Sequence, residues 1–311
     1  RACTGGIYGG NDAAAAKVAG HELKGVQAYF NCSIQGLCLP LIALVDYRGF
    51  RLLAISLLPI TRETLICGSH DGGRTVLNKD TTFDRKMKHA AGILNIRGHD
   101  AGTDPASRTF IHSAADVEGH LGTDGRYYLV DFSRTFPCEK PRRDITGSHL
   151  FRLLRPELVK EFPRPLCSDA FSNFTSAEYN DEVAAATEHL LNDRIPNLAA
   201  SLPEMLENSD KGVLRITEVV HARGVNIRWL GLVFTTLQRD VADSALKRKC
   251  LKLVLLEMMA RVIKQDIRRR LRGRMKKLKL PLEDPYCQLI ADYLNIVFGN
   301  NKKSGTYWEQ H

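Results

Sequence analysis

The pattern of hydrophobic residues changes near residue 145, and this change constrains the fold more than any single motif. Before it, short apolar runs bounded by glycine and aspartate turns predict β-strands with a few helices between them. After it, apolar residues recur at helical spacing and prolines interrupt the pattern at intervals. We therefore expect an α+β fold with a strand-rich N-terminal half and a helical C-terminal half.

The centre of the first half is predicted at residues 119–132, GHLGTDGRYYLVDF. The TDG sequence at 123–125 is typical of a tight turn, and residues 126–132 are rich in aromatic and β-branched side chains. The stretch therefore predicts a β-hairpin that closes on Asp131, which we expect to be buried at the end of the second strand. Such a carboxylate is either a capped or ion-paired structural group, or a ligand for a metal ion or a nucleotide phosphate.

Further elements are predicted on the N-terminal side of this hairpin. Asp12 is placed to cap a helix over residues 13–29. Residues 39–46 and 50–59 are nearly continuous apolar runs around the turn YRG. They predict an antiparallel hairpin that is covered on both faces. Residues 83–94 predict an amphipathic helix.

The composition is that of a soluble protein in a reducing compartment. Hydrophobic residues make up 44% and charged residues 25% of the chain, and no apolar run approaches the roughly 18 residues of a membrane helix. The eight cysteines include no CxxC pair, and none lies beside a histidine at metal-ligand spacing. This pattern favours free thiols in the cytosol over disulfides or structural zinc.

Basic residues are concentrated in residues 260–280, which hold ten of them and a single acid, Asp266. The apolar spacing of residues 251–267 predicts a helix here, and one basic stripe then steps along the opposite face by three or four residues. The stripe consists of Arg261, Lys264, Arg268, Arg272, Lys276 and Lys279. Like charges in one block repel each other unless an anion meets them, so we interpret the stripe as a candidate nucleic-acid-binding surface. The alternative is a solvated helix face.

Five stretches, in order along the chain, carry a family resemblance. They are GHELKG at 20–25, DYRGFR at 46–51, GHLGTDGRYYLVDFSRTFPCE at 119–139, FRLLRPELV at 151–159 and RGVNIRWLG at 223–231. Together they resemble the Clu domain of the clustered mitochondria protein family, and residues 257–264 resemble the family region that follows the domain. The tetratricopeptide repeats that follow in full-length members have no counterpart in this sequence.

On this basis we interpret residues 1–145 as the mixed α/β part of a Clu-like domain. Residues 146–311 are its helical part, with the basic helix near residues 247–280. Asn226 and Arg228 are expected to join the second half to the first through buried hydrogen bonds. Arg152 and Arg155 are expected to form ion pairs at a helix end.

The resemblance implies a non-enzymatic, cytoplasmic module without a cofactor that acts in the intracellular distribution of mitochondria. Its implied partners are mRNAs for mitochondrial proteins, ribosomes or translation initiation factors and, indirectly, the mitochondrial outer surface. The sequence has no RNP motif or KH loop, and no aromatic residues are interleaved with the basic stripe. The stripe therefore predicts contacts with phosphates rather than with bases.

A second interpretation belongs to another class of protein. A strand, a turn and a second strand ending in Asp131-Phe132 resembles the hairpin before the metal-binding Asp-Phe-Gly of protein kinases, with Ser133 in place of the glycine. In a kinase-like fold Asp131 would hold Mg²⁺ with ATP, and Asp116 or His120 would take the other polar roles near the phosphates. The Gly-rich loop, the strand lysine and the His-Arg-Asp motif cannot be recognised. This alternative is thus an inactive or regulatory ATP-binding domain.

Overall fold

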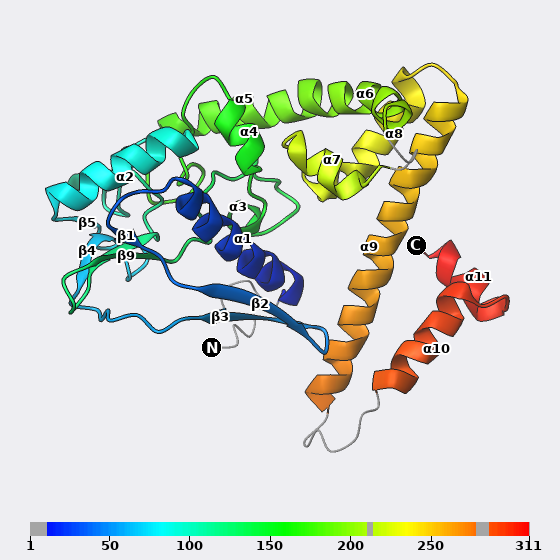
Figure 1. Cartoon of the computed structure of the whole chain (residues 1–311), viewed down its shortest axis with the longest axis horizontal. Coiled ribbons are helices and arrows are strands. Elements are labelled where there is room, and N and C mark those ends of the chain that lie inside the picture. The colour runs from blue at the N-terminus through cyan, green and yellow to red at the C-terminus, as the bar shows by residue number, and fades with distance from the viewer. Residues whose placement is uncertain (1–10, 210–213, 278–285, 311) are drawn as a thin grey trace.

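A computed structural model describes residues 11–209, 214–277 and 286–310 of the 311-residue chain. The strands are β1 (Leu37–Cys38), β2 (Ile42–Tyr47), β3 (Phe50–Ile55), β4 (Leu65–Gly68), β5 (Leu77–Asn78), β6 (His99–Ala101), β7 (Thr109–Ile111), β8 (Glu118–Leu121) and β9 (Tyr127–Val130). The helices are α1 (Asp12–Asn31), α2 (Thr81–Leu94), α3 (Ser148–Phe151), α4 (Pro156–Glu161), α5 (Asn180–His189), α6 (Ile195–Glu207), α7 (Ile216–Ala222), α8 (Leu230–Asp240), α9 (Ala245–Lys277), α10 (Tyr286–Phe298) and α11 (Lys302–Glu309). The strands of the described part precede residue 145 and most of its helices follow it, so the predicted fold class is confirmed (Figure 1).

The predicted central hairpin is present as β8 and β9. Their antiparallel register pairs Glu118 with Val130 and Leu121 with Tyr127. Within the described residues, these two strands lie at the centre of a five-stranded sheet of order β1-β9-β8-β4-β5, in which β1 runs parallel to β9. The hairpin therefore fixes the position of Asp131, which directly follows β9.

Helix α1 lies directly against the residues that follow β9, because Gly25 has no side chain at the point of contact. A Cβ atom on Gly25 would overlap the backbone carbonyl oxygen of Phe132. The predicted cap of this helix was wrong by one residue. Asn11 is the N-cap, accepting hydrogen bonds from the N–H groups of Ala13 (3.1 Å) and Ala14 (3.0 Å). Asp12 is instead the first helical residue, where its negative charge interacts favourably with the positive end of the helix dipole.

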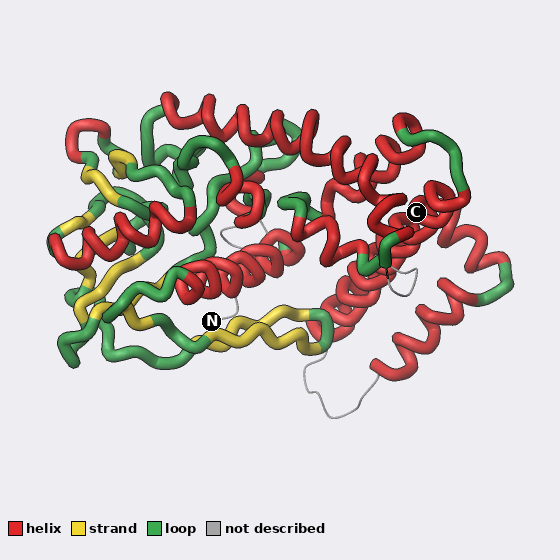
Figure 2. The backbone as a smooth tube through the Cα atoms, turned by 45° about the horizontal axis from the view of Figure 1, so that its top comes forward, coloured by secondary structure: helices red, strands yellow, loops and turns green. Residues whose placement is uncertain are grey.

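The predicted hairpin of β2 and β3 forms, but it is covered on one face only. Ile42, Leu44 and Leu53 are partly buried, and α1 packs against both strands. On the other face Val45 is 45% and Leu52 is 43% exposed. The expectation of cover on both faces was wrong because an apolar run does not reveal whether a second layer is present. Figure 2 shows that the tip of the hairpin reaches the C-terminal part of α9.

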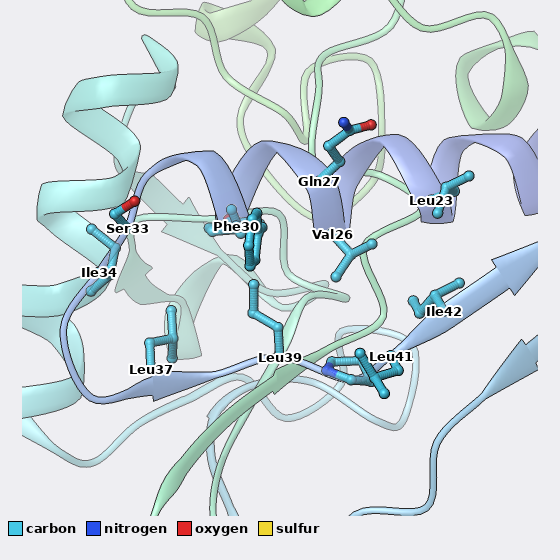
Figure 3. Close-up of a pocket in the computed structure, with 12 residues that line it drawn as sticks. Leu23, Val26, Gln27, Phe30, Ser33, Ile34, Leu37, Leu39, Leu41 and Ile42 are labelled. Atoms are coloured by element: carbon cyan, nitrogen blue, oxygen red, sulfur yellow. The ribbon is translucent and has the colours of Figure 1, made fainter.

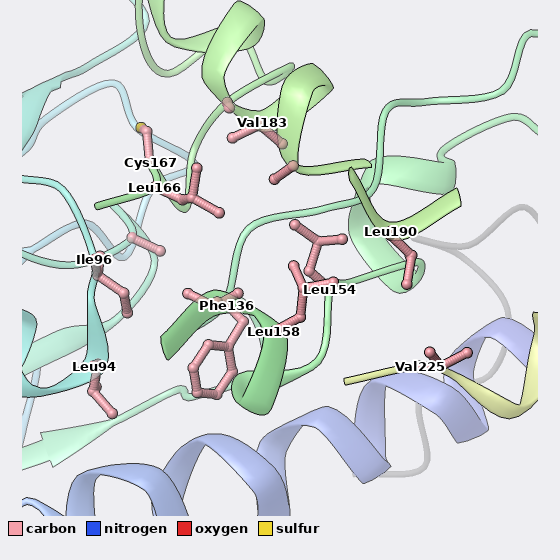
Figure 4. Packing of buried hydrophobic residues seen from close by; sticks show 14 of the residues in the cluster. Leu94, Ile96, Phe136, Leu154, Leu158, Leu166, Cys167, Val183, Leu190 and Val225 are labelled. Carbon is pink, nitrogen blue, oxygen red and sulfur yellow. The ribbon is translucent and has the colours of Figure 1, made fainter. Parts of the chain in front are cut away.

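One hydrophobic core runs through both halves of the chain. Phe136 from the first half packs in the same cluster as Leu154, Leu190 and Val225 from the second (Figure 4). The core also includes Phe83 and Met87 of the predicted helix over residues 83–94, which is observed as α2. The division of the domain at residue 145 stays a prediction, since side chains from both parts share this core.

Helix α9 is a 33-residue helix along one side of the molecule, and α10 and α11 run back beside it (Figure 1). Tyr293, Val297 and Tyr307 form a small second core with Ile263 and Ile267 of α9. The predicted basic helix near residues 247–280 is confirmed as far as residue 277, and residues 278–280 lie outside the described residues. No helix in the described part of the chain is long and apolar enough to cross a membrane.

Replacing Gly25 with alanine should lower the free energy of unfolding by about 1–3 kcal/mol, because the new methyl group would push α1 away from Phe132. Gly92→Ala on α2 is a matched control, since its Cβ would meet no atom within 4 Å. That variant should be neutral or more stable by up to about 1 kcal/mol through helix propensity. Denaturant titration of both variants measures the difference, and a Gly25→Ala protein as stable as the parent would contradict the close approach.

Candidate functional site

Some residues of the basic stripe on α9 contact other elements of the protein, and others are exposed to solvent. Arg268 pairs with Asp46 of β2, and Arg272 donates a 2.9 Å hydrogen bond to the carbonyl oxygen of Gly49. Arg272 also lies 3.4 Å from Asp12 of α1. The side chains of the two arginines are only 19% and 16% exposed. They hold the tip of the β2–β3 hairpin and the start of α1 against α9.

The N-terminal end of the stripe lies against α7. Arg261 forms a 2.6 Å ion pair with Glu257 and donates a 2.8 Å hydrogen bond to the hydroxyl of Thr217. Lys264 is exposed. Partial burial, and then the positive charges of Arg268 and Arg261, lower the pKa of Lys264. An anion at this point would relieve that repulsion.

The structure describes only part of the last two members of the stripe, Lys276 and Lys279. The backbone of Lys276 belongs to α9, while its side chain and all of Lys279 lie outside the described residues. Arg274 and Lys277 on the same turns are exposed. Arg269 and Arg270 both pair with Asp266, which is only 4% exposed. The cations of α9 that reach solvent therefore include Lys264, Arg274 and Lys277.

Asp131 is exposed, so the expectation that it is buried was wrong. It follows the last residue of β9 and adopts a left-handed backbone conformation with φ of 61°, which aspartate tolerates better than most residues. This turn directs the next residue, Phe132, into the core, where its N–H donates a 3.0 Å hydrogen bond to Glu22 of α1. Although Asp131 is exposed, partial desolvation of its carboxylate by neighbouring protein atoms, and then the charges of Asp116 and Glu22, raise its pKa well above the ordinary value.

Asp116 lies near Asp131 and is positioned by a buried ion-pair network. Arg134 lies 3.6 Å from Asp116 and 2.5 Å from Asp169, which is fully buried. Asp169 also accepts a 2.7 Å hydrogen bond from the N–H of Ala115, the residue before Asp116. One carboxylate oxygen of Asp116 is buried without a hydrogen-bond partner. Burial raises the pKa of Asp116, and the positive charge of Arg134 opposes the change.

His120 does not join the two aspartates. It is 4% exposed, and its ring hydrogen-bonds to the hydroxyl of Thr64 (3.0 Å) and to Glu118 (3.3 Å). Among the residues that the structure describes, no group of three or more His, Cys, Asp or Glu side chains could hold a metal ion. Of the three residues in the alternative metal site, the fold thus brings together Asp131 and Asp116 and leaves His120 in a structural role.

A buried carboxylate joins the two halves of the chain. Glu139 is 3% exposed, and its oxygens lie 3.0 Å from the indole nitrogen of Trp229 and 3.2 Å from the guanidinium of Arg228. The side-chain amide of Asn226 donates a 3.4 Å hydrogen bond to Glu139 and a 2.9 Å hydrogen bond to the carbonyl of Leu153, which lies in the same half as Asn226. The prediction that Asn226 and Arg228 join the two halves is confirmed, with Asn226 acting through a hydrogen bond and Arg228 through an ion pair.

An apolar pocket that the sequence did not reveal lies beside α1. Its volume is about 620 Å³, and its lining includes Val26, Phe30, Leu39 and Leu41 (Figure 3). Phe30 is 72% and Leu41 is 82% exposed. The pocket forms because the chain between α1 and β2 passes over an apolar face of the helix. None of the predicted site residues lines it.

The fold therefore defines an α+β domain whose helical half contains a long basic helix. Residues 6–140 match the family model Clustered mitochondria. Residues 213–310 match the model Translation initiation factor eIF3 subunit 135. The second match includes all of α9.

Curated relatives agree with the first match. The chain is similar to the Clustered mitochondria protein of Arabidopsis thaliana, with 36% identity over 161 residues, which is 49% of this chain and 11% of that protein. It is 32% identical to the Clustered mitochondria protein homolog of Danio rerio over 50% of this chain and 11% of the relative. Protein clueless of Drosophila ananassae is 34% identical over 41% of this chain and 9% of the relative.

Residues 6–140 thus match the family to which the sequence resemblance pointed. The chain spans only about a tenth of the length of the curated relatives it matches. No solved structure matches the chain.

Asp131→Asn should raise the melting temperature at neutral pH. A raised pKa means that folding disfavours the ionised carboxylate, so its stability cost appears as the pH rises above about 4, the ordinary value for aspartate. Asparagine removes the charge and tolerates the same left-handed backbone. The gain should therefore be present at pH 7 and absent at about pH 3 in thermal unfolding monitored by circular dichroism.

The same variant tests the ATP and Mg²⁺ alternative. A site that uses Asp131 would make Mg²⁺ with ATP stabilise the parent protein and not Asp131→Asn. If the variant is less stable than the parent without any ligand, the electrostatic account of Asp131 fails.

Proposed function

We propose that this chain is a non-enzymatic Clu-family module of the cytosol that acts in the intracellular distribution of mitochondria. In this role it binds mRNAs for mitochondrial proteins at cytosolic ribosomes. The match of residues 6–140 to the Clustered mitochondria model supports the link to mitochondria. The match of residues 213–310 to an initiation factor subunit supports the link to translation. Contact with the mitochondrial outer surface would be indirect, through a protein partner.

The observation that carries the proposal is the exposure of cations on α9 within the segment that matches the initiation factor subunit. Lys264, Arg274 and Lys277 reach solvent along this helix. A helix with a row of exposed cations can contact phosphates at successive positions along a strand. The helix contains no aromatic residue on which a base could stack. Binding should therefore be strong at low salt and tolerant of sequence.

The contacts of Arg268 and Arg272 refine the binding surface. Both arginines are engaged with the β2–β3 hairpin or α1, so their loss would alter how these elements pack as well as remove charge. A mutation of either arginine would therefore change both the charge of α9 and its packing. The exposed cations Lys264, Arg274 and Lys277 are the cleaner test.

Replacing Lys264, Arg274 and Lys277 together with glutamine should flatten the dependence of RNA affinity on salt. Each phosphate contact to single-stranded RNA contributes roughly 0.7 to the slope of log affinity against log salt. Loss of all three contacts should therefore reduce the slope by about 2. Fluorescence anisotropy with an unstructured RNA, over a range of salt concentrations, measures the slope.

A matched control removes the same charge elsewhere. Lys79, Arg85 and Lys88 are exposed at or near α2, which lies on the opposite side of the molecule from α9 (Figure 1). Their replacement with glutamine should leave the slope nearly unchanged. If both triple variants bind alike, or if the parent protein does not bind RNA at low salt, α9 is not the interface.

A further inference from the structure

Positive charges gather at the junction of the two halves, away from the stripe on α9. Lys17, His21 and Lys24 lie on one face of α1, separated by four and three residues. The charge of Arg228 lowers the pKa of all three, which places its guanidinium beside this face. Arg155 adds its charge next to Lys24. We call Lys17, Lys24, Arg152, Arg155 and Arg228 the junction cluster.

The junction cluster holds more cations than the nearby acids can neutralise. Glu139 is shared between Arg152 (3.4 Å) and Arg228 (3.2 Å). Glu157 pairs with Arg155 at 2.5 Å. Lys17 lies over the ring of Phe151, 5.3 Å from its centroid. The five cations thus face two carboxylates, both of which are already engaged by arginines.

Two guanidinium groups present unused donors in this cluster. Arg155 is only 8% exposed, and its Nη1 atom is buried without a hydrogen-bond partner. The Nη1 atom of Arg228 is also buried and lies close to Glu139 without making a hydrogen bond. A buried N–H group with no acceptor is unfavourable, and such groups are rare in folded proteins. An oxyanion at this place would supply the missing acceptors.

The titration of the neighbouring groups agrees with an excess of positive charge. Burial, followed by the charges of Arg155 and Arg228, lowers the pKa of Lys24 to about 8. Burial and then the charges of Arg155 and Lys24 lower the pKa of His221 to about 4, and burial and then Lys24 lower that of His21 to about 3. Both histidines are therefore neutral at pH 7, and Lys24 is close to losing its proton. A nearby anion would oppose the part of these shifts that comes from the neighbouring positive charges.

We propose that the junction cluster binds a compact, multiply charged phosphate compound, with Arg155, Arg228 and Lys24 as its principal contacts. Guanidinium groups donate paired hydrogen bonds that match phosphate oxygens, and an ammonium group adds a point charge. The ligand is compact because its contacts converge from three segments of the chain on one place, rather than following a line along one element. This ligand bridges α1, the segment around residues 152–157 and Arg228. It therefore stabilises the union of the two halves.

Inorganic pyrophosphate, without magnesium, is a suitable probe. It should raise the melting temperature of the parent protein more than sodium chloride of the same ionic strength does. Isothermal titration at pH 7 should show binding that is about tenfold weaker in Lys24→Gln, a variant that removes one charge and leaves the three ion pairs of the cluster intact. Lys88→Gln on α2 is the matched control and should bind like the parent.

A third variant separates binding from a structural effect. Glu157→Gln removes the carboxylate that competes for Arg155, so it should bind pyrophosphate more tightly than the parent. The difference in pyrophosphate affinity between the parent and Lys24→Gln should disappear near pH 10, because Lys24 is uncharged there. The titratable and charged groups that face Lys24 are Arg155, Arg228, Glu157, His21 and His221. Equal stabilisation by sodium chloride, equal affinity of Lys24→Gln and the parent, or weaker binding by Glu157→Gln would each overturn the proposal.

Discussion

The buried carboxylate of Glu139 is the group on which the union of the two halves depends. It is only 3% exposed. It accepts a hydrogen bond from the indole N–H of Trp229 and forms ion pairs with Arg152 and Arg228. Removing one partner of a buried ion pair costs about 3–5 kcal/mol, because the other charge is left without compensation. Glu139 lies at the end of the region that matches Clustered mitochondria, and Trp229 lies in the region that matches the initiation factor subunit. This carboxylate thus connects the two matched regions.

The positive charge of the chain serves two purposes in this account. Arg268 and Arg272 use their charge to hold the β2–β3 hairpin and α1 against α9, at distances that leave little room for another anion. Lys264, Arg274 and Lys277 remain exposed on the same helix, and the proposed RNA contact would use them. Because these cations lie on one long helix, their backbone positions are fixed before binding, so no backbone entropy is lost in ordering them.

Much of the architecture could be predicted from local sequence. The TDG turn and the residues that follow it specify the β8–β9 hairpin, and the helical spacing of apolar and basic residues specifies α9. The exposure of Asp131 could not be predicted, because alternation along a strand does not show where the strand ends. The pairing of Arg268 with Asp46 joins residues 222 positions apart, and the junction cluster assembles from three distant segments. Tertiary contacts of this kind leave no periodic signal in the sequence.

Native-state hydrogen exchange followed by mass spectrometry tests most directly whether the two matched regions form one folding unit. If they do, amides in α1, in β9 and in α8 should exchange only through global unfolding, with the same opening free energy and the same dependence on denaturant. The apolar core that includes Phe136, Leu154 and Val225 predicts this result. Opening of α8 and α9 at a lower free energy, while α1 and β9 stay protected, would show two independent units and contradict the account.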